Sequence, residues 1–344
     1  MPSDGDSPSG YATMGRERWI GLHWPERLGG AGRDPLATVA AEERFGYHWL
    51  PLSGYLLSVK TIGNALLGHA SEELQELLLP EIAGGRLVFC QGFSEPEAGS
   101  DLASLRTTAA RRDGGRFVVS GHKIWTSSAQ IADWIYLAVR TDPDASRPHR
   151  GISVLVADMR TPGIEVREIP TVGGGVLCEV FLDEVKVPES QLVGELHGGW
   201  RVLMGTLDHE RVTSEKVGVV LRVLDDLGQA ASSPADRLEL SRLRGEAQAA
   251  RLLGLRAAGL LAEGRPAAAA SSMAKLSIAL LARRSAELGV RLLGPEALVE
   301  RGDDAPADGR VAALTRASAG GTVAGGAAEI QRRVIARQGL GCAA

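Results

Sequence analysis

The chain contains few cysteines. Its 344 residues include three cysteines, Cys90, Cys178 and Cys342, which are scattered along the sequence without CxxC spacing or a neighbouring histidine cluster. This distribution predicts that there is no metal site, and it favours a reducing compartment, the cytoplasm.

Excess charge of one sign and long apolar runs are also lacking. The 38 basic and 42 acidic residues give a formal net charge of −4, so no basic surface for a nucleic acid is expected. The longest apolar stretches, such as residues 247–264, are interrupted by arginines, which predicts that no segment enters a membrane. The first ten residues, MPSDGDSPSG, lack the basic and apolar parts of a signal peptide, and we expect a short disordered lead-in there.

Two familiar catalytic or nucleotide-binding fingerprints are missing. No GxGxxG follows a predicted strand, which excludes a Rossmann dinucleotide site. No GxSxG occurs and the seven histidines form no constellation, so a serine hydrolase is poorly supported.

Hydrophobic periodicity divides the chain into three zones. Residues 35–82 have a helical pattern, in which Ser71 is a predicted N-cap ahead of Glu72. Residues 88–193 alternate with the period of strands, and the pattern becomes helical again after Gly199. The sequence therefore predicts an α+β fold, with boundaries that we place at 1–87, 88–196 and 197–344.

Two segments of the strand-rich zone carry the most information, GFSEPEAGSD (92–101) and GHKIWTSSAQIADW (121–134). Together with GLHWPERLGGAG (21–32), GWRVLMGTLDHERV (199–212) and AEIQRRVIARQGLG (328–341), they resemble the acyl-CoA dehydrogenase family, in its bacterial type, in the same order. The resemblance implies an N-terminal helical lobe, a middle β-barrel-like domain and a C-terminal bundle of the four-helix type. Only 18 residues precede Trp19, so we expect the lobe to be truncated and its first helix to be missing.

The resemblance also implies FAD as cofactor and assigns residues that contact it. Ser94 and Ser100 are expected to hydrogen-bond the flavin and the pyrophosphate, Ser100 lies beside the substrate as well, and Trp125 and Ser127 pack near the ring. Neutral donors tune a reduced flavin without forming a salt bridge. Residue by residue, the alternative is that the serines are turn residues and Trp125 belongs to the core.

The catalytic base of the family occupies one of two positions, and the resemblance places both here. The glutamate that many members carry before the last helix is Gly325 in this chain, followed by Gly326 and Ala327. Other members carry the base in an LxxER motif, which reads Leu207–Arg211, so Glu210 becomes the candidate, and Arg211 is expected to organise the substrate.

An independent argument from periodicity also favours Glu210. On a helix read from Trp200, Glu210 falls on the same apolar stripe as Leu203, Leu207 and Val217. Burial there would raise the pKa of its carboxyl group toward that of a useful general base. Arg211, about 100° further around such a helix, is expected to point elsewhere. The alternative is that Glu210 and Arg211 form a solvated surface pair.

The resemblance also implies a role for the two glycines at the position of the missing glutamate. The Gly325 N–H is expected to polarise the thioester oxygen, and Gly326 to contact the cofactor. The alternative is that residues 320–326 form a flexible connector.

The sequence predicts fewer contacts to the adenine half of FAD than members of the resembled family usually make. The family's Arg-x-Phe-Gly segment has no counterpart in residues 225–248, and Arg291 replaces a glutamine, which leaves it as a candidate for a phosphate contact. Ala327 and Ala328 also remove hydroxyls that would cap the last helix.

The resemblance leads to three hypotheses about function. The first is FAD-dependent α,β-dehydrogenation of an acyl-CoA or acyl-carrier-protein thioester, with Glu210 as the α-proton base and hydride transfer to flavin N5. An electron acceptor such as an electron-transfer flavoprotein would then be a partner, in a homodimer, a homotetramer or a hetero-oligomer with a paralogue. The second is a non-catalytic or half-site subunit of a heteromeric dehydrogenase, and the third is a flavin-dependent monooxygenase or oxidase.

Overall fold

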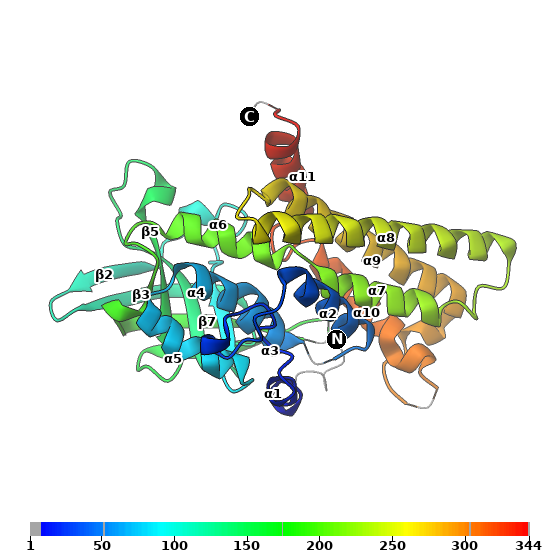
Figure 1. Ribbon diagram of the computed structural model, residues 1–344, viewed down its shortest axis with the longest axis horizontal. Coiled ribbons are helices and arrows are strands. Elements are labelled where there is room, and N and C mark those ends of the chain that lie inside the picture. The colour runs from blue at the N-terminus through cyan, green and yellow to red at the C-terminus, as the bar shows by residue number, and fades with distance from the viewer. Residues whose placement is uncertain (1–7, 51, 174, 303, 343–344) are drawn as a thin grey trace.

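The computed structural model describes residues 8–50, 52–173, 175–302 and 304–342. Helices, strands and helices follow one another along the chain, as the α+β prediction states, and the sheet lies at one end of the molecule with the long helices at the other (Figure 1).

The N-terminal part is helical and begins with α1 (Pro8–Arg16). A helix therefore precedes Trp19, and the predicted lead-in overlaps α1 at residues 8–10, while residues 1–7 lie outside the described residues. That the first helix usual in the family is missing stays a prediction. The predicted cap of α5 is confirmed, because the Ser71 side chain accepts a hydrogen bond from the Leu74 N–H at 3.2 Å. The other helices of this part are α2 (Pro35–Tyr47), α3 (Ser53–Tyr55), a π-helical segment (Leu56–Gly63), α4 (Asn64–His69) and α5 (Glu72–Ala83).

The middle part is one eight-stranded sheet with the order β6-β7-β3-β2-β4-β5-β8, and β1 pairs with β4 off this path. The long strands β3 and β7 pair in antiparallel fashion, with register shifts between Val119 and Gly121 and between Lys123 and Thr126. The strands are β1 (Phe89–Gly92), β2 (Thr108–Arg112), β3 (Arg116–Ser127), β4 (Trp134–Arg140), β5 (Ile152–Asp158), β6 (Ile164–Pro170), β7 (Val176–Pro188) and β8 (Leu192–Val193).

The C-terminal part is dominated by two long helices, α8 and α9, and the short helix α11 projects from its edge (Figure 1). Ser233 and Asp236 form a capping box at the start of α8, which satisfies two backbone N–H groups of the first turn. The helices are α6 (Gly199–Glu210), α7 (Ser214–Asp226), α8 (Pro234–Ala262), α9 (Ala268–Leu293), α10 (Arg310–Gly321) and α11 (Ala328–Val334).

The single helix expected from Trp200 onward was wrong in one respect. The chain leaves helical structure after Glu210 and resumes it at Ser214, so the predicted apolar stripe is divided between α6 and α7. Glu210 is the last residue of α6, and Arg211 is its C-cap.

Buried apolar residues join these parts. One core cluster runs from the N-terminal helices through Phe93 and Tyr136 of the middle part to Leu203 of α6, and a second fills the C-terminal helices around Leu224 and Leu281. The first cluster fixes α6 against the sheet, and so positions the end of α6 beside the segment 92–101. Among the described residues, no helix combines the length and the apolar character needed to cross a bilayer.

Candidate active site

Two cavities meet between the sheet and the C-terminal helices. The larger has a volume of about 560 Å³ and is lined by the segments around Ser94, Trp125 and Val323, and the smaller, of about 340 Å³, extends along α6 and α11. The residues that line both are Gln91, Phe93, Ser94, Gly99, Ser100, Glu210, Gly325 and Gly326. Glu210 therefore lies at the junction of the two cavities.

The larger cavity is lined by all four residues that the sequence assigns to the flavin: Ser94, Ser100, Trp125 and Ser127. The three serine hydroxyls have no hydrogen-bond partner within the described part of the chain, and so remain available to a ligand. Trp125 is 56 % exposed, so the alternative that it belongs to the core was wrong. A cavity of neutral donors beside an accessible indole fits a planar heterocycle with amide-like edges, such as a flavin.

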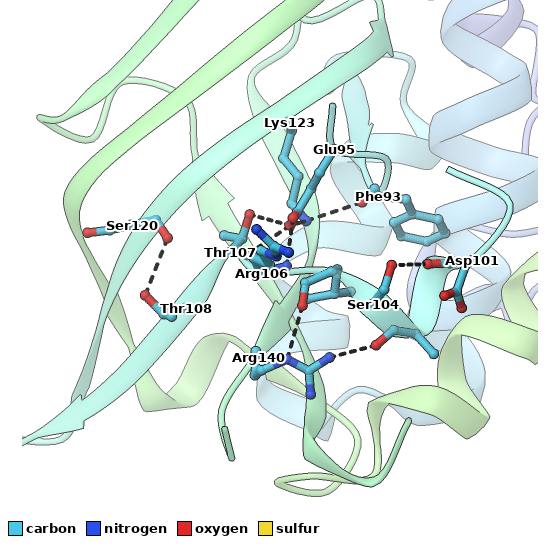
Figure 2. Close-up of polar contacts among 12 residues, drawn as sticks. Phe93, Glu95, Asp101, Ser104, Arg106, Thr107, Thr108, Ser120, Lys123 and Arg140 are labelled. Atoms are coloured by element: carbon cyan, nitrogen blue, oxygen red, sulfur yellow. Dashed lines mark hydrogen bonds and ion pairs between the residues drawn. The ribbon is translucent and has the colours of Figure 1, made fainter. Parts of the chain in front are cut away.

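A buried ion pair fixes the wall of this cavity (Figure 2). The Lys123 Nζ donates to Glu95 Oε1 at 2.8 Å and to the Phe93 carbonyl at 3.2 Å. The Glu95 carboxylate also accepts hydrogen bonds from the Arg106 and Thr107 N–H groups and from the Thr107 hydroxyl, at 2.6 to 2.9 Å. Burial lowers the pKa of Lys123 to about 8, and the Glu95 carboxylate opposes this shift.

The ion pair connects the two segments that carry the candidate flavin contacts. Glu95 follows Ser94 directly, Lys123 precedes Trp125 by two residues, and the Ile124 N–H donates to the Ser94 carbonyl at 2.9 Å. Trp125 itself has a positive φ of 61°, a strained conformation for a non-glycine residue. We infer that the pair holds the serine loop and the Trp125 turn at a fixed separation.

Glu210 presents its carboxylate to both cavities. Its Oε2 is buried and has no hydrogen-bond partner in the described structure, while the Gln91 side chain contacts the carboxylate. Burial raises the pKa of Glu210, and the cations Lys216 and Arg211 partly oppose this shift. The alternative of a solvated surface pair was wrong, since Arg211 is also buried, with 7 % of its surface exposed.

Arg211 does not point away from the site as expected. The Arg211 guanidinium lies toward the site and donates from Nε to the Gly325 carbonyl at 3.4 Å. Its Nη1 lies 3.4 Å from Asp208 Oδ1, which balances its charge. Arg211 thus lines the smaller cavity and supports the turn opposite Glu210.

The turn at Gly325 and Gly326 uses backbone conformations that glycine favours, with φ of +66° and +97°. Gln331 Nε2 donates to both carbonyls, at 3.2 and 3.0 Å, and the Lys275 Nζ donates to the Gly326 carbonyl at 2.7 Å. A flexible connector does not fit these contacts at residues 325 and 326. Both glycines line both cavities, as the sequence-based assignment requires.

Arg291 is not brought to the site. Its guanidinium, at the end of α9, forms ion pairs with Asp236, at 2.7 Å, and with Glu239, and it lines neither cavity. The predicted phosphate contact of Arg291 is therefore not formed by this chain as it stands. The predicted loss of the last helix cap is confirmed, because Ala327 precedes α11 without a side-chain cap.

Three residues of the site were missed in the sequence. Gln91 stands one residue before the 92–101 segment, Lys275 is the single lysine of α9, and Gln331 lies within the quoted segment 328–341. An isolated lysine in an alanine- and leucine-rich helix is a usable signal, since burying an ammonium group requires a partner. For the two glutamines the sequence offers no comparable signal.

This arrangement defines a class of protein. A cavity of neutral hydroxyls with an accessible tryptophan, joined at a desolvated carboxylate to a second cavity with apolar walls, is typical of a flavin-dependent oxidoreductase that removes a proton from carbon. Among the described residues, no three His, Cys, Asp or Glu side chains are grouped as metal ligands would be.

Comparison with known proteins identifies the family. Residues 4–86, 90–185 and 197–340 match the N-terminal, middle and C-terminal domains of acyl-CoA dehydrogenase, respectively. "Acyl-CoA dehydrogenase FadE26" of Mycobacterium tuberculosis is 33 % identical over 96 % of this chain and 86 % of its own length. The chain belongs to the acyl-CoA dehydrogenase family.

Solved structures agree with this assignment. The structure described as "Tcur3481-Tcur3483 steroid ACAD" superposes with a TM-score of 0.90 at 32 % identity, covering 98 % of this chain and 88 % of that chain. The ChsE4-ChsE5 complex from Mycobacterium tuberculosis gives 0.87 at 32 % identity, covering 98 % and 90 %. The predicted family and fold are confirmed: the protein is an FAD-dependent oxidoreductase of CH–CH bonds that catalyses acyl-CoA dehydrogenation.

Proposed function

We propose that this protein removes the α-proton of an acyl-CoA with Glu210 as the general base. The observation that carries the proposal is the place of Glu210, whose carboxylate lies where the flavin-lined cavity and the apolar cavity meet. A base must reach the α-carbon while the β-carbon faces the electron acceptor, and this junction is where both conditions are met.

Glu210 would take the proton, and other residues would hold the cofactor. The α C–H bond breaks, and its proton passes to a carboxylate oxygen of Glu210. Burial raises the pKa of Glu210 and so makes its ionised form a stronger base. Ser94, Ser100, Trp125 and Ser127 would hold FAD, which, when bound, supplies the acceptor for the hydride that leaves the β-carbon.

Negative charge that develops on the thioester oxygen needs a donor. The N–H groups of Gly325 and Gly326 have no acceptor within the described chain, and both residues line both cavities. We infer that the Gly325 N–H receives this oxygen, since fixed backbone donors stabilise such charge strongly. Arg211 supports the carbonyl side of the same turn, and Ser100 lines both cavities, where it would face the substrate as well as the cofactor.

The acyl group would lie in the smaller cavity. This cavity has a volume of about 340 Å³ and apolar walls that include Leu102, Trp200, Met204 and Leu207, which favours a hydrophobic acyl group. Similarity to the steroid ACAD supports this inference. We propose a branched or polycyclic acyl-CoA rather than a short straight chain.

The test uses Glu210→Gln and follows the absorbance of bound FAD when acyl-CoA is added without oxygen. General-base catalysis contributes about 10²- to 10⁴-fold, so bleaching should slow by at least about 100-fold. Glu329→Gln, which changes an exposed carboxylate on α11, is the control and should bleach at the parental rate. Unchanged bleaching in Glu210→Gln would remove Glu210 from this role.

A second candidate is a subunit that binds FAD fully only together with a paralogue. The observation that favours it is Arg291, which is engaged in ion pairs instead of facing the cavities, and the ChsE4-ChsE5 structure is a complex of two different chains. Co-expression with a neighbouring paralogue separates the candidates. FAD and activity found only in the mixed complex support the second candidate, whereas a fully active homo-oligomer excludes it.

A further inference from the structure

The turn opposite the base is held by side chains from three different helical segments. Arg211 follows α6, Lys275 lies in α9 and Gln331 in α11, and together they donate four hydrogen bonds to two adjacent carbonyls, those of Gly325 and Gly326. The shortest of these contacts is the one from Lys275, at 2.7 Å.

Planar peptide bonds connect the held carbonyls to the neighbouring N–H groups. Each carbonyl shares a planar trans unit with the next N–H, so fixing the oxygens of Gly325 and Gly326 fixes the N–H directions of Gly326 and Ala327. The N–H of Gly325 belongs to the preceding peptide unit, which is joined to the held unit at the Gly325 Cα, where φ is +66°. The N–H groups of residues 325 to 327 have no acceptor in the described structure and remain available to the cavities.

The side chains of Arg211, Lys275 and Gln331, which we call the clamp, are closely packed. Lys275 is 3 % exposed and Gln331 is fully buried. A Cβ added to Gly326 would lie 2.5 Å from Gln331 Nε2, so only glycine lets the side chain approach the turn this closely. The position of the carbonyls is therefore set by the clamp and not by solvent.

Lys275 is an unusual donor for such a task. Within the described residues it forms no ion pair, and its ammonium group has the Gly326 carbonyl as its hydrogen-bond partner. The charged groups that face it are Lys216, Arg211, Glu210 and Glu329, and burial together with the two nearby cations lowers its pKa to about 8. A buried ammonium that pairs with a backbone oxygen instead of a carboxylate suggests a role in holding that oxygen.

We propose that Lys275 is a positioning residue, which together with Gln331 holds the 325–327 turn so that its N–H groups receive the thioester oxygen of the substrate. This inference rests on the proposed function, since the turn has this task only if an acyl thioester is polarised beside Glu210. Lys275 itself acts through the backbone and does not contact the reacting atoms.

Lys275 also carries a charge near Glu210, and this effect has to be separated from positioning. Lys216 provides the matched control, because it lowers the pKa of Glu210 more strongly than Lys275 does but has no hydrogen bond to the turn among the described contacts. Lys216→Met therefore removes charge alone, and Lys275→Met removes charge and contact. Lys275→Arg keeps the charge and a donor.

The experiment measures the bound substrate directly. FAD-loaded protein, with its partner subunit where one is needed, carries Glu210→Gln to prevent turnover and is mixed with an acyl-CoA labelled with ¹³C at the thioester carbonyl. Isotope-edited infrared spectra give the downshift of the carbonyl stretch, which reports the hydrogen bonds to that oxygen. Adding Lys275→Met should reduce the downshift, Lys275→Arg should restore part of it, and Lys216→Met should leave it unchanged.

Kinetics on the protein with Glu210 intact provide the second readout. Loss of one preorganised donor costs about 10²- to 10³-fold in kcat, so loss of its support should cost roughly tenfold in kcat with little change in KM. If Lys275→Met does not fold, as thermal unfolding will reveal, Gln331→Met removes two of the four contacts and is expected to behave in the same way.

Different outcomes would contradict the positioning role of Lys275 and the role of Glu210 as the base. An unchanged carbonyl downshift in folded Lys275→Met, or an equal loss in Lys216→Met, overturns the positioning role whatever Glu210 does. Continued bleaching of flavin in Glu210→Gln overturns the base assignment, while the infrared comparison still reports on the clamp.

Discussion

Gly325 and Glu210 occupy the same small space from opposite sides: a Cβ added to Gly325 would lie 2.8 Å from Glu210 Oε1. A larger side chain at position 325 would therefore require the carboxylate of Glu210 to shift. The glycine at the position of the missing glutamate leaves room for the carboxylate of Glu210.

Gly325→Ala tests this relationship. The substitution should slow flavin reduction at least about tenfold, because the methyl group displaces the carboxylate, and lower stability by about 1 kcal/mol or more, because φ is positive. Stopped-flow bleaching and urea unfolding measure the two effects. Gly321→Ala is the control, since a Cβ there meets no atom within 4 Å. Equal bleaching rates for Gly325→Ala and the parent would contradict the shared space.

The pH dependence of the reaction should reflect the burial of Glu210. The raised pKa of Glu210 means that the ionised base is lost on the acid side at a pH above the ordinary range of glutamate, so kcat/KM rises with pH through that raised value. His209 does not explain this rise of kcat/KM with pH, because burial lowers its pKa to about 4. Lys216→Met removes a cation that favours the ionised form of Glu210 and should move the rise in kcat/KM to higher pH. A rise that stays at the same pH in this variant would show that the titrating group is not Glu210.

The ion pair between Glu95 and Lys123 should contribute strongly to stability. Lys123→Met leaves the Glu95 carboxylate buried without its counter-ion, at a cost of about 3–5 kcal/mol in the free energy of unfolding. Equilibrium urea unfolding measures this, and flavin content should fall because the Ser94 loop loses its attachment to β3. The control is Arg111→Met, whose ion pair with Glu189 is exposed, so its loss should change the free energy of unfolding far less. Similar losses in both variants would argue against the structural role.

Trp125 should report the arrival of the cofactor. Its indole is 56 % exposed at the larger cavity, so binding of FAD should quench its fluorescence. Trp125→Phe should abolish most of the quenching and weaken binding, because aromatic contact is reduced. Trp19→Phe is the matched control, since Trp19 is 41 % exposed and stacks on Phe45 outside the cavities. Full quenching in Trp125→Phe would show that the ring binds elsewhere.

The sequence was sufficient for the parts of the site that depend on local order. Ser94 and Ser100 lie on one loop, Trp125 and Ser127 on one strand end, and the motif order brings them to one cavity. Glu210 was predicted from its apolar stripe, and its pKa is raised by burial as expected. The serines and Trp125 were assigned from the resemblance to the family, whereas periodicity over a few helical turns gave Glu210 separate support.

The inward turn of Arg211 was not predictable by the same means. Periodicity assigns a residue to one face of a helix, but it does not report where a long side chain ends, and the Arg211 guanidinium reaches the carbonyl of Gly325, far along the chain. Gln91, Lys275 and Gln331 were missed because their partners lie far away in the sequence or are backbone atoms, which no spacing rule reports.

Glu210 and the turn that faces it belong to different helical segments, which separates two properties that a single loop would have to share. The pKa of Glu210 depends on α6 and its surroundings, whereas the directions of the N–H groups of the turn depend on the fastening of residues 325 and 326. A substitution at Gln331 can therefore alter the turn without altering the helix that carries the carboxylate.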